Sequence, residues 1–206
     1  MYTYSSHQSN MLQFTLIPSP NMSIAAQASM AINAGCSWIE IDPTGIGDND
    51  LQSIIDTCRD HEIILVFKHN DLLLEKTRVH GIHLGQADID PLQLRERLGG
   101  HPIIGVDVTS ETPMQPLKRA DIDYVVLTGY PDNISTSDIQ SLHNNQQSQG
   151  ITFPIVVSGQ IKSSELQSLI NAGASGFNID INSLQAPEYE VSLAAFKNAA
   201  DSISRH

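Results

Sequence analysis

The chain has 206 residues and a formal net charge of −12, and this length fits one domain with a large buried core. Its basic residues are scattered, which argues against a nucleic-acid partner, because binding a phosphate backbone needs clustered Lys and Arg. No apolar stretch approaches the ~20 residues of a membrane span, so we expect no membrane partner. The polar residues 1–10 are interpreted as a flexible tail rather than a secretory signal, and the two cysteines form no C-x-x-C pair, so a cytoplasmic location is expected.

Apolar segments alternate with helical segments along the chain. Strands are predicted at residues 13–17, 38–42, 63–68, 81–84, 103–108, 124–127, 153–157 and 176–179. Helices are predicted at residues 22–34, 49–61, 72–77, 91–98, 112–120, 137–147, 163–172 and 190–204. The helix at 49–61 shows the clearest pattern, because its apolar residues fall on one face. The helix at 91–98 begins with Pro91, a residue that suits the first turn.

A repeated helix-to-strand turn supports a parallel sheet. Residues 32–42 match residues 170–180 at most positions, and each copy runs from a helix end through a glycine into an apolar strand closed by aspartate. Helices and strands that alternate in this way form parallel sheets, and eight of each predict a single (β/α)₈ TIM barrel over residues 1–206. An open doubly wound sheet is the alternative. Against it, the proline-containing segment 17–20 stands where its glycine-rich phosphate turn would follow the first strand.

Polar residues gather where the predicted strands end, and in a barrel these ends converge on one mouth. Carboxylate oxygens suit magnesium, so Asp71 and Asp88, which follow the third and fourth strands, are predicted to hold one Mg²⁺ ion. The full set of residues at this predicted rim is Asp42, Asn70, Asp71, Gln86, Asp88, Asp107, Asp132, Asn133, Ser158, Gly159, Gln160 and Asp180.

Each candidate also has a purely structural interpretation. Asp71 is a natural N-cap for a helix that begins at Leu72. Asp88 could cap the next helix, although Asp90 is better placed to do so. His83 lies in the middle of a strand and faces either the barrel interior or the helices, where a hydrogen-bonded structural role is favoured. His69 lies at the rim and is more open to a functional role.

The order Asn70-Asp71 followed by Gly-Ile-His-Leu-Gly-Gln-Ala-Asp at 81–88 resembles the signature of the thiamine phosphate synthase and TenI-like family. The resemblance extends over nearly the whole chain and implies a (β/α)₈ barrel. It implies a transferase that joins an aminopyrimidine diphosphate to a thiazole phosphate and releases pyrophosphate, with Mg²⁺ as cofactor. The phosphorylated heterocycle is then the small-molecule partner, and a homo-oligomer is possible.

The resemblance also implies roles for individual residues. Asp71 and Asp88 would hold magnesium, which neutralises charge as the diphosphate departs. The residues assigned to substrate binding are Asn70 against the pyrimidine, Gln86 within the motif, Asp107 at the position of a family serine, and Gly159 near the thiazole phosphate.

The chain departs from the family where the family carries cations. Residues 42–44 are Asp-Pro-Thr in place of Arg-Glu-Lys, and the segment 129–137 has no lysine. Each charged hydrogen bond lost in this way is worth roughly 1.5–3 kcal/mol. An alternative hypothesis is therefore a divergent member that binds a different heterocycle or acts without the usual turnover. A third is an isomerase or lyase that uses His69, His83 or Asp107 as acid–base groups.

Overall fold

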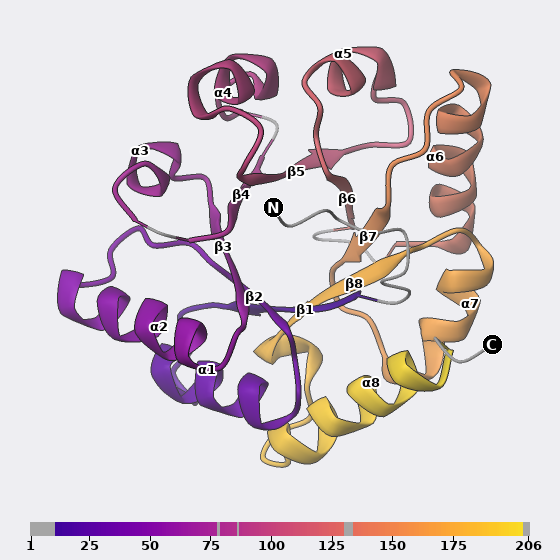
Figure 1. Ribbon diagram of the computed structural model, residues 1–206. Coiled ribbons are helices and arrows are strands. Elements are labelled where there is room, and N and C mark those ends of the chain that lie inside the picture. Colours follow the sequence, from indigo (N-terminus) through magenta and orange to yellow (C-terminus); the bar gives the residue numbers. More distant parts are fainter. Residues whose placement is uncertain (1–10, 78, 86, 130–133, 204–206) are drawn as a thin grey trace.

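The computed structural model describes residues 11–77, 79–85, 87–129 and 134–203. Its strands form one closed parallel barrel in which neighbours follow chain order from β1 to β8, with the helices outside (Figure 1). The barrel closes where β1 pairs with β8, with Leu12 opposite Phe177 and Gln13 opposite Asn178. The predicted (β/α)₈ barrel is therefore confirmed, and the open doubly wound sheet is excluded. The predicted tail at 1–10 lies outside the described residues.

The strands lie close to their predicted positions. The starts of β1 and β7 each differ by two residues from the prediction, and at β7 Phe153 and Pro154 remain outside the strand. The Phe153 N–H donates to the side chain of Gln146 over 2.6 Å, and proline has no N–H to offer to a neighbouring strand. The strands are β1 Met11–Leu16, β2 Trp38–Ile41, β3 Ile64–Lys68, β4 Gly81–Leu84, β5 Ile103–Val108, β6 Tyr124–Thr128, β7 Ile155–Ser158 and β8 Gly176–Asp180.

A helix follows each strand, and none of the described helices is long and apolar enough to span a membrane. The helix before β8 begins as a 3₁₀ turn, η1, at Ser163–Glu165, and a second turn, η2, at Ile181–Ser183 follows β8. The helices are α1 Ile24–Asn33, α2 Asp48–Asp60, α3 Asp71–Leu74, α4 Pro91–Leu98, α5 Met114–Arg119, α6 Thr136–Ser148, α7 Leu166–Asn171 and α8 Tyr189–Ile203.

The caps of α3 and α4 decide which rim carboxylates are held by backbone. The interpretation of Asp71 as an N-cap is wrong, because Asn70 is the cap of α3 and its Oδ1 accepts from the Leu73 N–H over 3.1 Å. Asp71 is the first residue of that helix. Asp90 caps α4, as the sequence favoured, and accepts from the N–H groups of Leu92 and Gln93. Asp88 is therefore not needed as a helix cap.

Alternation along each strand separates an apolar outer layer from a mixed interior. Outward-facing residues such as Ile39, Phe67 and Ile82 are fully buried between the sheet and the helices. The inward positions near the amino ends of the strands form a small apolar cluster that fills the barrel floor. Its buried members are Trp38, Val66, Tyr124, Val126 and Val156. The barrel is therefore packed at its floor rather than open through its length.

Gly105 on β5 makes room for this floor. The Tyr124 ring stands edge-on to Trp38 at a centroid distance of 5.6 Å, and a Cβ atom at Gly105 would lie 2.1 Å from Tyr124 Cζ. We expect Gly105→Ala to lower the free energy of unfolding by about 1–3 kcal/mol, because the ring must leave its rotamer in a filled interior. Urea denaturation measures this change. Gly100→Ala is the control, since a Cβ there meets no atom within 4 Å; equal effects of the two substitutions would contradict the packing argument.

Candidate active site

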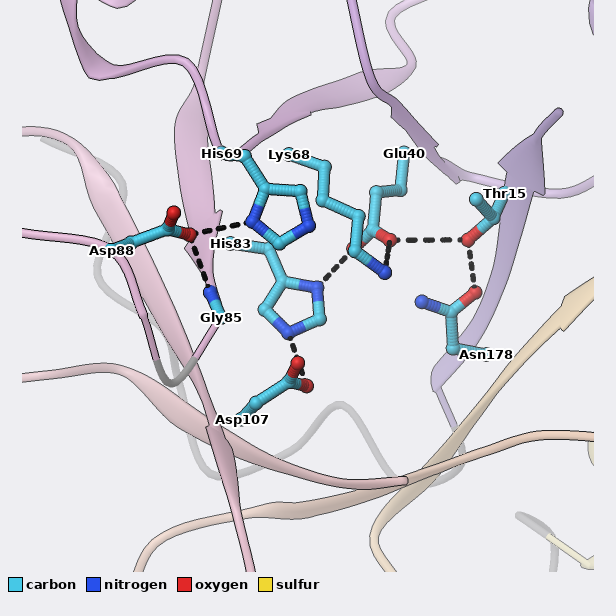
Figure 2. Close-up of polar contacts among 9 residues, drawn as sticks. All are labelled: Thr15, Glu40, Lys68, His69, His83, Gly85, Asp88, Asp107 and Asn178. Atoms are coloured by element: carbon cyan, nitrogen blue, oxygen red, sulfur yellow. Dashed lines mark hydrogen bonds and ion pairs between the residues drawn. The ribbon is translucent and has the colours of Figure 1, made fainter. Parts of the chain in front are cut away.

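The barrel interior becomes polar toward the carboxyl ends of the strands, where barrel enzymes carry their chemistry. These side chains come from strands that are far apart in sequence and point toward one another inside the barrel (Figure 2). Glu40, His83 and Asn178 are almost completely buried, whereas Lys68 is 30% exposed and therefore reaches the mouth. The layer consists of Thr15 on β1, Glu40 on β2, Lys68 on β3, His83 on β4, Asp107 on β5 and Asn178 on β8.

His83 lies between two carboxylates. Its Nδ1 is 2.7 Å from Glu40 Oε2, and its Nε2 is 2.9 Å from Asp107 Oδ1. A neutral imidazole carries only one N–H, so one nitrogen lone pair would then face a carboxylate oxygen. An imidazolium donates to both carboxylates. The sequence left open whether His83 faces the interior or the helices, and the structure places it in the interior.

The electrostatics of this group agree with its geometry. Burial by itself raises the pKa of Glu40, but the His83 charge and hydrogen bond, helped by Lys68, outweigh it and lower that pKa to about 2. Burial by itself lowers the pKa of His83, but Glu40 and Asp107 together raise it to about 9. The interior therefore carries a Glu40 carboxylate and a His83 imidazolium at neutral pH.

These shifts predict how stability depends on pH. His83 has a folded pKa of about 9 against an ordinary 6.5, so its contribution is complete below pH 6.5 and is lost as pH rises through 9. Glu40 has a folded pKa of about 2 against an ordinary 4.5, so its contribution is complete above pH 4.5 and is lost as pH falls toward 2. We expect the free energy of unfolding, measured with urea, to fall between pH 6.5 and 9, and to fall less in His83→Gln. Equal slopes for the two proteins would contradict the assignment.

Lys68 brings a positive charge to the mouth. Its Nζ lies 3.7 Å from Glu40 Oε1, and Thr15 Oγ1 donates to the same oxygen over 3.2 Å. Within the part of the chain that the structure describes, Lys68 is the only Lys or Arg that lies in a strand. It lies at the end of β3, two residues before Asn70.

His69 and Asp88 form a second polar group above His83 (Figure 2). The His69 Nδ1 lies 2.5 Å from Asp88 Oδ2, and the same oxygen accepts from the Gly85 N–H over 2.7 Å. His69 has a φ of +63°, a strained value for a residue with a side chain. Gly85 allows the close approach, because a Cβ there would lie 2.7 Å from His69 Cε1. The chain therefore accepts backbone strain to hold a histidine on Asp88 at the mouth.

The two predicted magnesium ligands have different partners. Asp71 forms an ion pair with Arg97 of α4, and Arg97 Nε also lies 2.7 Å from Glu75. Asp88 is held by His69 Nδ1 and by the Gly85 N–H. Residues 11–203, with 78, 86 and 130–133 left aside, hold no group of three or more His, Cys, Asp or Glu side chains suited to a metal ion.

Other predicted rim residues lie elsewhere or cannot be placed. Gly159, with Ser158 and Gln160, lines a cavity of about 150 Å³ beside the start of α7. The Asp42 carboxylate accepts from the Thr44 N–H over 2.9 Å, and Asp180 caps η2. The predicted substrate residue Gln86 lies outside the described residues, as do Asp132 and Asn133.

Sequence reasoning missed four members of the interior layer. Thr15, Glu40, Lys68 and Asn178 lie in strands that were interpreted only as apolar segments. Period-two alternation could have identified them, because Glu40 lies two residues after Trp38, and Lys68 two residues after Val66. Alternation assigns such residues to one face of a strand. It does not say which face is the barrel interior.

The fold and the site together define a (β/α)₈ barrel with a charged interior that opens at the carboxyl ends of its strands. Comparison with solved structures agrees. The thiamine phosphate pyrophosphorylase of Pyrococcus furiosus superposes with a TM-score of 0.74 at 15% identity, covering 96% of this chain and 98% of that one. The phosphoribosyl anthranilate isomerase of Thermus thermophilus reaches 0.66 at 13% identity, covering 93% and 98%. Likeness at such identities shows the fold alone.

Sequence comparison identifies the family. Residues 15–179 match the family described as thiamine monophosphate synthase. The thiamine-phosphate synthase of Bacteroides fragilis is 24% identical over 86% of this chain and 93% of its own length. That of Chlorobium phaeobacteroides is 30% identical over 72% and 76%. The chain belongs to the thiamine monophosphate synthase family, which makes it an enzyme of the transferase class. The predicted resemblance is confirmed, and the hypothesis of a member without the usual turnover is not favoured.

Proposed function

We propose that the protein joins an aminopyrimidine diphosphate to a thiazole phosphate, forming thiamine phosphate. The thiazole nitrogen forms a bond to the methylene carbon of the pyrimidine. The bond from that carbon to the diphosphate oxygen breaks, and its electron pair leaves with pyrophosphate. The family match over residues 15–179 carries the proposal, because it begins in β1, ends in β8 and so reaches all eight strands around the mouth.

Four residues are proposed to contact the substrates. Asn70 uses its carbonyl oxygen to cap α3, so its NH₂ group is the part that it can offer to a pyrimidine nitrogen. Asp107 lies in the interior layer beside His83. Gly159 borders a cavity of about 150 Å³ on the β7 side of the mouth, where a thiazole phosphate could approach backbone. Gln86 is retained from the family motif alone.

We propose that Asp71 and Asp88 hold Mg²⁺ together with the substrate diphosphate. They follow the carboxyl ends of the adjacent strands β3 and β4. Within the described residues both contact their partners through Oδ2, so each can offer Oδ1. This donor set fits the ion, because Mg²⁺ often takes one or two carboxylates and completes its shell with water and substrate phosphates. Bound there, it would neutralise charge on the departing pyrophosphate. Arg97 is the competing partner of Asp71.

Two measurements test this function. The first is formation of thiamine phosphate from the two substrates with Mg²⁺, followed by chromatography; no product at high enzyme concentration would contradict the proposed reaction. The second is the melting temperature with Mg²⁺ and pyrophosphate, which needs no turnover. We expect the melting temperature to rise for the natural chain, and Asp71→Asn or Asp88→Asn to abolish the rise. A rise that survives both substitutions would contradict the ligand assignment.

Residues 42–44 contain no cation that could bind the diphosphate. We propose that Lys68 supplies this positive charge. We expect Lys68→Ala to raise the KM for the aminopyrimidine diphosphate by roughly 10- to 100-fold, the size of one lost charged hydrogen bond. Steady-state kinetics at saturating thiazole phosphate measure this change. Lys76→Ala removes the same charge from an exposed position after α3 and should leave KM unchanged. Equal KM values for the two variants would mean that groups other than Lys68 bind the diphosphate.

A further inference from the structure

Glu40, His83 and Asp107 form a group of ionisable side chains inside the barrel. Ionised side chains in a barrel interior are costly unless each is paired, and such groups mark functional sites. Glu40 is fully buried and His83 is 1% exposed, whereas the Asp107 side chain keeps 16% of its surface exposed. Asp107 is therefore the member of the group that a ligand in the mouth can reach.

His83 donates a hydrogen bond to a carboxylate on each side, one at the buried end of the group and one at the exposed end. Glu40 accepts from His83 Nδ1 over 2.7 Å, and this fixes the plane of the imidazole. His83 Nε2 then donates to Asp107 Oδ1 over 2.9 Å. The second oxygen of Asp107, Oδ2, points away from His83 (Figure 2). The pair behind Asp107 therefore sets the direction in which its carboxylate accepts hydrogen bonds.

We propose that Asp107 accepts a hydrogen bond from the exocyclic amino group of the pyrimidine substrate, and that Glu40 and His83 are positioning residues that hold its carboxylate toward the mouth. This inference rests on the proposed function and assigns a specific recognition role within it. An amino group attached to a pyrimidine is a hydrogen-bond donor without full charge, so it suits a carboxylate whose charge is already balanced. His83 provides that balance.

Among the residues that the structure describes, the charged groups that face His83 fit this arrangement. Glu40 on β2 and Asp107 on β5 face its two nitrogens, and Lys68 on β3 lies 3.7 Å from Glu40. The Tyr124 ring on β6 packs against the His83 ring at a centroid distance of 6.3 Å. Two carboxylates thus meet one imidazolium and one ammonium, and a neutral donor can enter without leaving a charge unbalanced.

The test compares two small probes, 4-aminopyrimidine and unsubstituted pyrimidine, which differ in the amino group. Dissociation constants are measured by ligand-detected NMR at neutral pH, without Mg²⁺ or phosphate. We expect the natural chain to prefer 4-aminopyrimidine by at least about tenfold, since a site built to accept a hydrogen bond rejects the analogue that lacks the donor. Asp107→Asn should reduce this ratio to about one, because its NH₂ group replaces an acceptor with a donor.

Asp42→Asn is the matched control. It makes the same chemical change on an exposed rim carboxylate whose partner is the Thr44 N–H, and it should keep the preference of the natural chain. His83→Leu should lose the preference, and His83→Gln should restore part of it, because an amide can still donate to Asp107. If His83→Leu does not fold, His83→Gln and Asp107→Asn are compared instead. His83→Gln should then keep part of the preference for 4-aminopyrimidine, and Asp107→Asn should keep none. A structural role for His83 would affect both probes equally and leave the ratio unchanged.

The pH profile gives an independent readout. The preference should be lost as pH rises through about 9, where His83 loses one of the two N–H protons that it donates to the carboxylates, and Asp107→Asn should show no such loss. The inference is overturned if the natural chain does not prefer 4-aminopyrimidine, or if Asp107→Asn keeps the preference. Because neither probe can react, absence of synthase activity would refute the proposed reaction and leave this result standing.

Discussion

Replacing Glu40 by alanine should lower the free energy of unfolding by about 3–5 kcal/mol, the largest stability effect expected of any single substitution in the barrel interior. Removing one partner of a buried ion pair is strongly destabilising, because the other partner loses charge compensation that water does not replace. Here His83 keeps Asp107 at Nε2, but it loses one of its two carboxylates and the acceptor of its Nδ1–H at a site where its side chain is 1% exposed. Urea denaturation near pH 6, where both groups of the natural chain are charged, measures the effect.

The double variant Glu40→Ala/His83→Leu separates pairing from packing. If the pair is the reason for the loss, the double variant should lose less than the sum of the two single variants, because removing both charges removes the penalty of leaving one unpaired. Additive losses would mean that each side chain acts through its own packing. A loss below about 1 kcal/mol for Glu40→Ala would mean that the ion pair adds little.

Asp88→Asn should reduce kcat/KM for thiamine phosphate formation by at least about a hundredfold, because it removes a proposed magnesium ligand and the carboxylate that orients His69. The asparagine oxygen can still accept the hydrogen bond from the Gly85 N–H, so the turn after β4 should remain in place. Steady-state kinetics across a range of Mg²⁺ concentrations measure the loss. We expect that raising Mg²⁺ recovers part of the activity.

Asp90→Asn makes the same chemical change two residues further along the chain. Asp90 caps α4 through backbone N–H groups, and asparagine is as good an N-cap as aspartate. Activity and stability should therefore both be retained. If Asp90→Asn loses as much activity as Asp88→Asn, the effect belongs to the segment as a whole rather than to the carboxylate of Asp88.

The element order could be predicted because it depends on local patterns. The turn that precedes β2 recurs before β8, and apolar segments mark each strand. The two cap interpretations had opposite outcomes for a local reason. Asp90 precedes Pro91, a residue fixed at the first turn of a helix, so its cap position was determined. Asn70 and Asp71 are both good caps, so the interpretation of Asp71 as the cap placed it one residue too late.

The candidate site was predicted only where a motif carried it. Asp88 was identified from its place after the glycine that ends β4, and the structure adds its contact with His69. Glu40 and Lys68 were not identified, because each lies within an apolar segment, and a single charged residue there has no local signature. The contact of Asp71 with Arg97 was equally beyond prediction, since it depends on how α3 and α4 pack.

The sequence by itself determined that helices and strands alternate, that the strands are parallel, and that carboxylates follow β3 and β4. These properties depend on neighbouring residues and on the period of each element. Only the tertiary structure decided which charges meet. His83 reaches Glu40 across 43 residues and Asp107 across 24, because closing the barrel turns one face of every strand inward. The face that turns inward follows from the register of the whole sheet, which no single segment encodes.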